Sequence, residues 1–328
     1  MKHISILVPQ GALLGSIEGP RQVFSEVNTM IEDRLGKGPM FKVQLVAFKK
    51  DVPVYDGLYT INPDALTKDI SKTDLIIIPA LAGDVAKAVQ ENEEFIPWII
   101  RQHHAGAEVA SLCIGAFLLA ATGLVNGKKV ATHWMAADAF RKAFPEVELV
   151  EDKILTDENG IYSSGGAFSY LNLLLYLIEK YAGRELSVLA AKTFQIDIDR
   201  KSQSPFMMFQ GQKSHEDETI HRAQDFIEKN VQEKISVDQL ATMLALSRRN
   251  LERRFKKATS NTVVEYIQRV RVEAAKQNLE SSRDNVNEVM YKVGYTDSKA
   301  FRSTFKRITG LSPVQYRNKY NRLAMSEN

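Results

Sequence analysis

The sequence predicts two domains of different fold class. Residues 1–195 form an α/β domain with a doubly wound, mainly parallel sheet, and residues 220–328 form an all-α domain with two helix-turn-helix units. Three observations carry this prediction: strand-like and helix-like segments alternate in the first part, one helical design occurs twice in the second, and the two parts carry opposite net charge. A chain of 328 residues is long enough for two separate cores.

Short apolar runs alternate with helical patterns in the first domain. Strands are expected at residues 4–8, 42–48, 74–79, 108–112, 129–132 and 161–163, and helices at 20–35, 84–102 with a break at Pro97, 114–123 and 170–181. In the run 74–79, residues 75–78 are continuously apolar and a proline follows them, which is typical of a strand covered on both faces. Strands separated by helices indicate a parallel, doubly wound sheet of the flavodoxin-like type.

Charge is divided unevenly along the chain. The whole sequence has a net charge of only +3, but residues 220–328 contain 21 basic and 12 acidic side chains, giving +9, and the remainder carries −6. A basic module attached to an acidic domain indicates a polyanionic partner such as nucleic acid. On charge alone, chance clustering is the alternative.

Cysteine usage and hydropathy indicate the compartment. Cys113 is the single cysteine, so no internal disulfide forms, which suits a reducing environment. The uncharged stretch at residues 109–125 contains two glycines and reads as a strand, a turn and a helix. We therefore expect a cytoplasmic protein without a membrane segment. Residues 196–219 are polar with interspersed aromatics and are expected to form a linker that is partly docked.

Residues 235–257 and 286–307 repeat one design. Each segment has a short amphipathic helix, a tight turn, a capping serine and a second helix, with Ser247 and Ser298 as the expected caps. An apolar pair at i, i+4 spacing gives each second helix a single buried face. These pairs are Leu251 with Phe255 and Phe301 with Phe305.

The opposite face of each second helix is basic. It carries Arg249, Arg253, Lys256 and Lys257 in the first unit, and Lys299, Arg302, Lys306 and Arg307 in the second. A capped helix with one apolar and one basic face suits the major groove of double-stranded DNA. A surface helix with solvated charges is the alternative, and two copies with matched cores favour DNA binding.

The second unit resembles the signature of the AraC/XylS family of DNA-binding domains. The matching residues are Val293-Gly294-Tyr295, Asp297, Phe301, Phe305-Lys306, Gly310, Ser312-Pro313 and Tyr316-Arg317. The resemblance implies seven helices, a long helix at about Val263 to Leu279 that joins the two units, and recognition helices in successive major grooves.

The same resemblance implies which side chains contact DNA. The base-reading positions fall on Arg249, Glu252, Arg253, Lys299, Arg302 and Ser303, where arginine reads guanine and glutamate accepts from cytosine. The full set of candidate DNA-binding residues adds Ser247, Lys256, Ser298 and Lys306. Arg254, Lys306 and Arg307 are better placed for phosphates or for packing.

Cys113 stands at a strand-to-helix junction in residues 108–121. This arrangement is typical of a nucleophile elbow, and a helix dipole there favours a thiolate. His133 follows the next candidate strand, and carboxyl ends of parallel strands converge, so the two side chains are expected to share a cleft. The alternative is that Cys113 is a small buried apolar residue and His133 a hydrogen-bonded core histidine.

The first domain resembles the PfpI-type, class I glutamine-amidotransferase-like superfamily. The resemblance covers residues 1–210 and rests on residues 76–79 with Gly83, 110–121, 123–127, 131–134, 183–186 and 203–206. Combined with the C-terminal module, it is similar to the GlxA-type subset of AraC regulators. Enzymes of the superfamily use a cysteine, a histidine and an acidic residue near the end of the first strand, and Cys113 and His133 stand at the first two positions.

Two departures argue against catalysis. Ile114 replaces the histidine that follows the cysteine in protease-like members, and Ser16 occupies the acidic position, with Glu18 two residues on. A thiol without a base beside it is a poor catalyst. We therefore expect an inherited pocket that senses a ligand, without a metal or cofactor. Its candidate members are Ser16, Gly83, Cys113, His133, Trp134, Gly165 and Gly166.

The chemistry of the candidate pocket suits a small metabolite. Backbone amides at the two helix N-termini suit a carboxylate, and Trp134 either faces a cationic or apolar part of the ligand or packs in the core. An amino-acid-like molecule or a quaternary amine is the expected effector.

The leading hypothesis is a ligand-responsive, homodimeric transcriptional regulator that contacts RNA polymerase if it activates. One alternative is an isonitrile-hydratase-like enzyme with Cys113 as nucleophile and a DNA-binding tail. The other is a constitutive DNA-binding protein whose first domain only dimerises.

Overall fold

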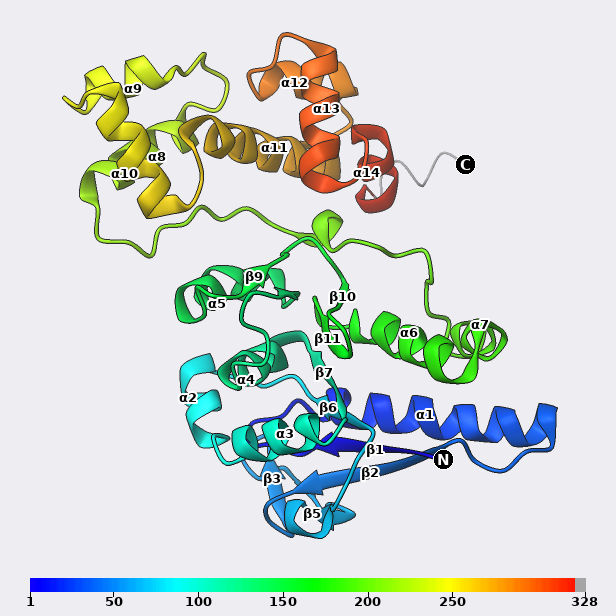
Figure 1. The fold of residues 1–328 in the computed structure, drawn as a ribbon. Coiled ribbons are helices and arrows are strands. Elements are labelled where there is room, and N and C mark those ends of the chain that lie inside the picture. Colours follow the sequence, from blue (N-terminus) through cyan, green and yellow to red (C-terminus); the bar gives the residue numbers. More distant parts are fainter. Residues whose placement is uncertain (322–328) are drawn as a thin grey trace. The chain divides into compact units, whose positions relative to one another are not determined.

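A computed structural model describes residues 1–321 and divides the chain into two compact units, one comprising Met1–Gln203 and the other beginning at Ser204 (Figure 1). The first unit is α/β and the second is helical, as the sequence predicts. None of the helices within residues 1–321 combines the length and apolarity needed to cross a lipid bilayer.

The first unit is built on a seven-stranded sheet. From one edge to the other the strands are β10 (Leu155–Asp157), β11 (Ile161–Ser164), β7 (Glu108–Leu112), β6 (Leu75–Ile78), β1 (Lys2–Leu7), β2 (Phe41–Ala47) and β5 (Ala65–Leu66). All neighbours pair in parallel except β10, which is antiparallel to β11. The predicted mainly parallel sheet is confirmed, and the apolar run that predicted a doubly covered strand is the central strand β6.

Helices cover both faces of this sheet. One face holds α1 (Leu14–Leu35), α6 (Tyr170–Ala182) and α7 (Arg184–Thr193), and the other holds α2 (Val85–Glu91), α3 (Phe95–His104), α4 (Ala116–Ala121) and α5 (Ala137–Ala143). Along β6, Leu75 and Ile77 join the first core, whereas Ile76 and Ile78 join the second. Successive side chains of a strand point to opposite faces, so one apolar strand supplies both cores.

The helical pattern at residues 84–102 breaks at a different place from the one predicted. Pro97 is the third residue of α3, where its missing N–H has no helical acceptor to lose, so the prediction of a break at Pro97 is wrong. The interruption lies between α2 and α3, at Asn92, whose buried side chain bonds both the backbone N–H (2.7 Å) and the carbonyl (3.0 Å) of Gln10.

Two short sheets lie outside the main one. The first is a hairpin of β3 (Val52–Val54) and β4 (Tyr59–Ile61), and the second pairs β8 (Lys129–Val130) with β9 (Glu148–Leu149). The strand expected at residues 129–132 therefore ends earlier than predicted and does not join the main sheet. The chain continues from β8 past the carboxyl end of β7, where the Thr132 hydroxyl donates to the Cys113 carbonyl (3.0 Å).

The second unit contains seven α-helices within residues 204–321, as the resemblance implied. They are α8 (Glu218–Lys229), α9 (Val237–Met243), α10 (Arg248–Thr259), α11 (Val263–Ser281), α12 (Val286–Lys292), α13 (Ser298–Thr309) and α14 (Pro313–Tyr320). Two cores form around α11. Its first half, including Tyr266 and Val270, packs with α8–α10, and its second half, including Ala275 and Leu279, packs with α12–α14.

Residues 204–217, here called the strap, run along the second unit before α8 begins (Figure 1). The Tyr320 hydroxyl donates to the Pro205 carbonyl (2.9 Å), and the Lys276 ammonium donates to the Met207 carbonyl (2.7 Å). Phe209 packs edge-on against Tyr266, with ring centroids 5.1 Å apart. The strap thus contacts both halves of the helical unit.

The strand-to-helix turn after β7 requires glycine at position 115. A Cβ atom there would lie 2.4 Å from the Pro79 carbonyl oxygen and 2.8 Å from that of Ile78, and both oxygens belong to the backbone, so neither can rotate away. We expect Gly115→Ala to lower the free energy of unfolding by about 1–3 kcal/mol, as overpacking in a core does. Thermal unfolding followed by circular dichroism measures this.

Gly15→Ala is the matched control, because a Cβ atom at Gly15 in α1 meets nothing within 4 Å. It should leave stability unchanged or raise it by up to about 1 kcal/mol. Equal unfolding midpoints for the two variants would show that the turn is loosely packed.

Candidate functional site

Each helix-turn-helix unit consists of a short helix, a turn and a longer second helix. The turn contains one residue with positive φ, Ala245 (53°) after α9 and Gly294 (76°) after α12. After these turns, α10 and α13 each begin with a side-chain cap. The Ser247 hydroxyl accepts from the backbone N–H of Asn250 (3.3 Å), which confirms the first predicted cap.

The second predicted cap is wrong. Asp297 caps α13, with its carboxylate accepting from the backbone N–H of Ala300 (2.6 Å), and Ser298 is the first residue of the helix. The capping residue follows the positive-φ residue by two positions in the first turn and by three in the second. Matching Ser247 to Ser298 therefore places the second cap one residue too late. A carboxylate at a helix N-terminus also interacts favourably with the helix dipole.

The two units share a duplicated framework fifty residues apart. Thr259 and Thr309 both donate to the carbonyl of a core phenylalanine, at 2.8 Å and 2.9 Å. Tyr266 and Tyr316 are both buried and both donate to a glutamate, Glu228 at 2.7 Å and Glu280 at 2.5 Å. Each tyrosine ring also packs edge-on against that phenylalanine, Phe255 or Phe305.

The exposed faces of α10 and α13 carry the predicted DNA-contacting residues. All four apolar residues of the repeated pairs are fully buried, and Arg249, Glu252, Arg253, Lys256, Lys299, Arg302, Ser303 and Lys306 are all exposed. Within residues 1–321, the side chains of Arg249, Lys299 and Arg302 form no hydrogen bond or ion pair and are thus available to a partner.

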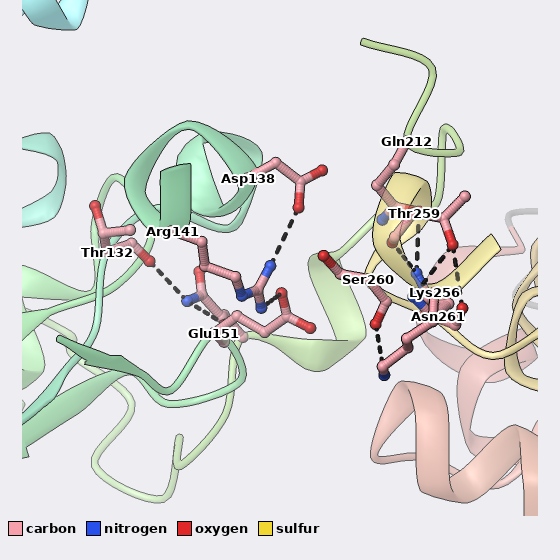
Figure 2. Close-up of polar contacts among 10 residues, drawn as sticks. Thr132, Asp138, Arg141, Glu151, Gln212, Lys256, Thr259, Ser260 and Asn261 are labelled. Carbon is pink, nitrogen blue, oxygen red and sulfur yellow. Dashed lines mark hydrogen bonds and ion pairs between the residues drawn. The ribbon is translucent and has the colours of Figure 1, made fainter. Parts of the chain in front are cut away.

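Other side chains on these faces are held in place. The guanidinium of Arg253 donates to the Asn250 side chain (3.0 Å), and Lys256 donates to the Ser260 carbonyl (2.9 Å; Figure 2). Glu252 is paired with Arg248 at 3.1 Å. Arg248 was not among the residues selected from the sequence, although its i, i+4 spacing from Glu252 could have predicted this ion pair.

Arg254 has a packing role. Its guanidinium makes two hydrogen bonds to the Asp217 carboxylate (2.9 and 2.6 Å), and this contact holds the pKa of that carboxyl below its usual range. Asp217 also caps α8 through the backbone N–H of Ile220. The pair therefore ties the end of the strap to the recognition helix α10. Of the alternatives that the sequence left open for Arg254, the structure favours packing.

Cys113 adopts the backbone conformation expected of an elbow. Its φ is +53°, and it begins a 3-10 turn (Cys113–Gly115) that joins β7 to α4. Its backbone N–H donates to the Ser164 hydroxyl at the end of β11 (3.4 Å), and its side chain is 4% exposed. A positive φ at a non-glycine residue is strained, and neighbouring strands hold it here.

The expected thiolate is not favoured at this elbow. Burial raises the pKa of the Cys113 thiol to about 11, outweighing the opposing hydrogen bond from the backbone of Ile114. Burial also lowers the pKa of His133, whose Nδ1 accepts from the backbone N–H of Met135 (3.1 Å) and whose Nε2 therefore carries the proton. The Trp134 ring lies 5.5 Å from that imidazole, between centroids. A protonated thiol and a neutral imidazole are the resting states at neutral pH.

The backbone amides of Gly165 and Gly166, which precede α6, are bonded within the protein. The N–H of Gly165 donates to the Ile154 carbonyl (2.9 Å), and that of Gly166 donates to the Gln203 side chain (3.1 Å). A Cβ atom at Gly165 lies 2.6 Å from the Gln203 amide nitrogen, so glycine there makes room for the glutamine. Gly165 and Gly166 therefore support Gln203, and in this arrangement both of their amides are bonded within the protein.

Gln203 is the residue that sequence reasoning missed. It is fully buried, and its amide nitrogen donates to the carbonyls of Thr132 (2.9 Å) and Glu151 (2.6 Å). Figure 2 shows these two residues, together with the ion pair from Glu151 to Arg141 (2.6 Å). The one signal available was its place in the motif 203–206, which carried the resemblance.

The acidic position of the superfamily has no carboxylate. Ser16 lies in the first turn of α1, where its hydroxyl donates to the Leu13 carbonyl (2.6 Å) and accepts from the backbone N–H of Ala80 (3.0 Å). Glu18 accepts two hydrogen bonds of 2.6 Å from the Arg21 guanidinium on the surface. Gly83 is exposed, with a φ of +78°. Ser16 thus has a structural role, joining the start of α1 to the segment after β6.

Comparisons with known proteins agree with this geometry. Residues 20–180 match the model of the DJ-1/PfpI family, and residues 240–319 match that of a helix-turn-helix domain. The HTH-type transcriptional regulator GbdR of Pseudomonas aeruginosa is 29% identical over 262 residues, which is 79% of this chain and 69% of that protein. The isonitrile hydratase of Pseudomonas putida is 28% identical over 177 residues, covering 53% of this chain and 72% of the enzyme.

One solved structure supports the fold alone. It is an AraC family transcriptional regulator from Pseudomonas putida, with a TM-score of 0.51 and 14% identity, covering 59% of this chain and all of that one. The duplicated, capped basic helices and the matches over both units define a helix-turn-helix transcriptional regulator. The chain belongs to the AraC family, with a DJ-1/PfpI domain preceding its DNA-binding module.

The raised pKa of Cys113 makes its reactivity testable. At pH 8 only about one thiol in a thousand is ionised in the folded protein, against about a quarter in the unfolded chain. We expect native protein to be alkylated by iodoacetamide at least about 100-fold more slowly than protein in denaturant, measured by mass spectrometry.

The raised pKa of Cys113 also makes the free energy of unfolding depend on pH. The folded pKa is above the unfolded one, so its contribution to stability is present below about pH 8.5 and is lost as pH rises from there towards 11.

Rapid alkylation of folded protein at pH 8 would contradict the expected slow reaction and show that the thiol is accessible and ionised.

Proposed function

We propose that this protein binds double-stranded DNA sequence-specifically by placing α10 and α13 in two successive major grooves. The observation that carries the proposal is the pair of exposed basic faces on a framework duplicated at a fifty-residue interval. Successive grooves on one side of B-DNA lie about 34 Å apart, and reading two of them needs two recognition helices on a common support, which α11 provides.

Base edges are proposed to be read by one set of side chains on each helix. These are Arg249, Glu252 and Arg253 on α10, and Lys299, Arg302 and Ser303 on α13. Lys256 and Lys306 follow on the same faces and suit phosphates, while Ser247 and Ser298 stand at the helix N-termini, where backbone amides also suit phosphates.

We propose that the DJ-1/PfpI unit senses a small metabolite beside Cys113, His133 and Trp134 and does not turn it over. A protonated buried thiol, a neutral histidine and the absence of a carboxylate at Ser16 support this. A triad needs a base oriented by a third group. An amino-acid-like or quaternary-amine effector is the proposed class, and the regulator is proposed to act in the cytoplasm as a homodimer, with RNA polymerase as a further partner if it activates.

An enzymatic role is the second candidate. The strained elbow conformation of Cys113 and the 28% identity to an isonitrile hydratase favour it. Turnover of a substrate that depends on the Cys113 thiol distinguishes it from sensing.

Two arginine variants test the base contacts. Arg253→Ala should relax the base preference in one half of the binding site and Arg302→Ala in the other, at positions about one helical turn apart. Each guanidinium that bonds a guanine discriminates by about 1–3 kcal/mol. Selection from a randomised duplex library at fixed salt measures the preferences.

Arg222→Ala is the matched control, since Arg222 is an exposed arginine on α8, outside both recognition helices. It should leave the preference as in the wild type. Uniformly weaker binding by Arg253→Ala and Arg302→Ala, with unchanged preference, would mean that both arginines contact the DNA backbone instead of bases.

Ligand sensing is tested by a thermal-shift screen of amino-acid-like and quaternary-amine metabolites on the whole chain. We expect one class to raise the unfolding temperature without being consumed. Cys113→Ser should keep the fold and DNA binding but alter the ligand affinity, because a shorter and more strongly hydrogen-bonding hydroxyl replaces the thiol. Calorimetry gives the affinity, and mass spectrometry detects any product. Turnover that Cys113→Ala abolishes would establish the enzyme instead.

A further inference from the structure

A polar cleft of about 150 Å³ lies between the two halves of the helical unit. Its walls come from three helices: Lys256 near the end of α10, Glu265 and Arg269 on α11, and Arg307 on α13. Ser260 and Asn261, which connect α10 to α11, close one side. The cleft is therefore made by both helix-turn-helix units together with the helix that joins them.

The charge of the cleft favours an anion. Three of its side chains are cationic and one is a carboxylate, giving a local charge of +2. Glu265 accepts from the backbone N–H of Thr262 (2.8 Å), which is the main cause of its lowered pKa, and its carboxylate also interacts electrostatically with Lys256 and Arg269. One carboxylate offsets one of the three cations, and the remaining positive charge favours an anion.

The cationic groups are positioned by the surrounding structure. Lys256 is held by the Ser260 carbonyl (2.9 Å; Figure 2), and the Arg307 guanidinium donates to the Gln268 side chain (2.7 Å). The Arg269 guanidinium lies 5.8 Å from the centre of the Phe209 ring, which belongs to the strap. A planar guanidinium with a fixed orientation offers paired donors that match phosphate oxygens.

The strap also supports the wall of the cleft. The Asn261 side chain donates to Gln212 of the strap (3.1 Å) and to the Thr259 carbonyl (2.7 Å), both drawn in Figure 2. Asn261 is buried, and its neighbour Ser260 ends α10 with a φ of +58°. The connection between α10 and α11 is thereby fixed, and with it the position of Lys256.

The cleft adjoins both DNA-reading faces. Lys256 follows Arg253 by three residues on the exposed face of α10, and Arg307 follows Ser303 by four on α13. When two helices occupy successive major grooves, the sugar-phosphate backbone runs between them. The anion that meets the cleft is then a phosphodiester of that backbone.

We propose that this cleft binds one phosphodiester of the DNA backbone between the two major grooves that α10 and α13 enter. The inference rests on the proposed mode of DNA binding. Residues of both units then contact the same phosphate, and this contact orients the protein on the duplex in addition to contributing affinity.

A duplex selected by the wild-type protein provides the test. Its phosphates are replaced one at a time by neutral methylphosphonates, and the dissociation constant of the full chain is measured for each duplex. We expect one position between the two grooves at which replacement weakens wild-type binding. Arg307→Gln and Arg269→Gln should bind less tightly but lose sensitivity to that replacement, with base preference unchanged.

The salt dependence gives a second readout. Losing one phosphate contact lowers the slope of log K against log salt by about 0.9, so the deficit of each variant relative to wild type should shrink about threefold between 50 and 200 mM salt. Arg222→Gln removes an equal charge from α8 and should preserve the sensitive phosphate. Circular dichroism of each variant establishes that it is folded.

These measurements distinguish a failure of the proposed DNA-binding function from a failure of phosphate binding by the cleft. If the wild-type protein selects no sequence from a random library, the proposed DNA-binding function fails. If it does select a sequence but Arg307→Gln and Arg269→Gln keep both the sensitive phosphate and the wild-type salt slope, the cleft does not bind phosphate. A changed base preference in the folded variants would also overturn the inference, because it would make these residues base contacts.

Discussion

Helix α11 is shared by two hydrophobic cores, and the arrangement of the DNA-binding unit depends on that sharing. Tyr266 and Val270 are buried with the first helix-turn-helix unit, and Ala275 and Leu279 with the second. Burying one large apolar side chain stabilises a fold by about 1.5–3 kcal/mol, so neither half can leave α11 without exposing several such side chains. The two recognition helices are consequently presented as one rigid element, and the cleft between them has fixed walls.

In the first unit, geometry and electrostatics lead to different conclusions about Cys113. Its backbone has the strained conformation of a nucleophile elbow, but the thiol is buried and its pKa is about 11. A helix dipole contributes typically 0.3–1 kcal/mol, and α4 has only six residues, so it cannot offset the desolvation of a buried thiolate. The fold preserves the shape of a reactive site while its surroundings keep the sulfur protonated.

Sequence patterns predicted features that depend on local periodicity. The apolar run at β6 predicted a strand covered on both faces, which is the central strand of the sheet, and the repeated apolar pairs identified both recognition helices. Features decided by distant residues could not be predicted in this way. The break after α2 depends on Asn92 bonding Gln10, and the Gly166 amide is occupied by Gln203, thirty-seven residues away. The cap of α13 was misassigned for a local reason, since Asp297 and Ser298 are adjacent and both suit a cap.

The strap leaves very little free chain between the two units. Gln203 is buried in the first unit, bonded to the Gly166 amide and the Thr132 carbonyl beside the elbow, whereas the Pro205 carbonyl is held by Tyr320 in the second. Three consecutive residues span at most about 7 Å between their outer Cα atoms. One residue, Ser204, separates these two hydrogen-bonded positions, so a change in the position of Gln203 has to be taken up within a few backbone bonds.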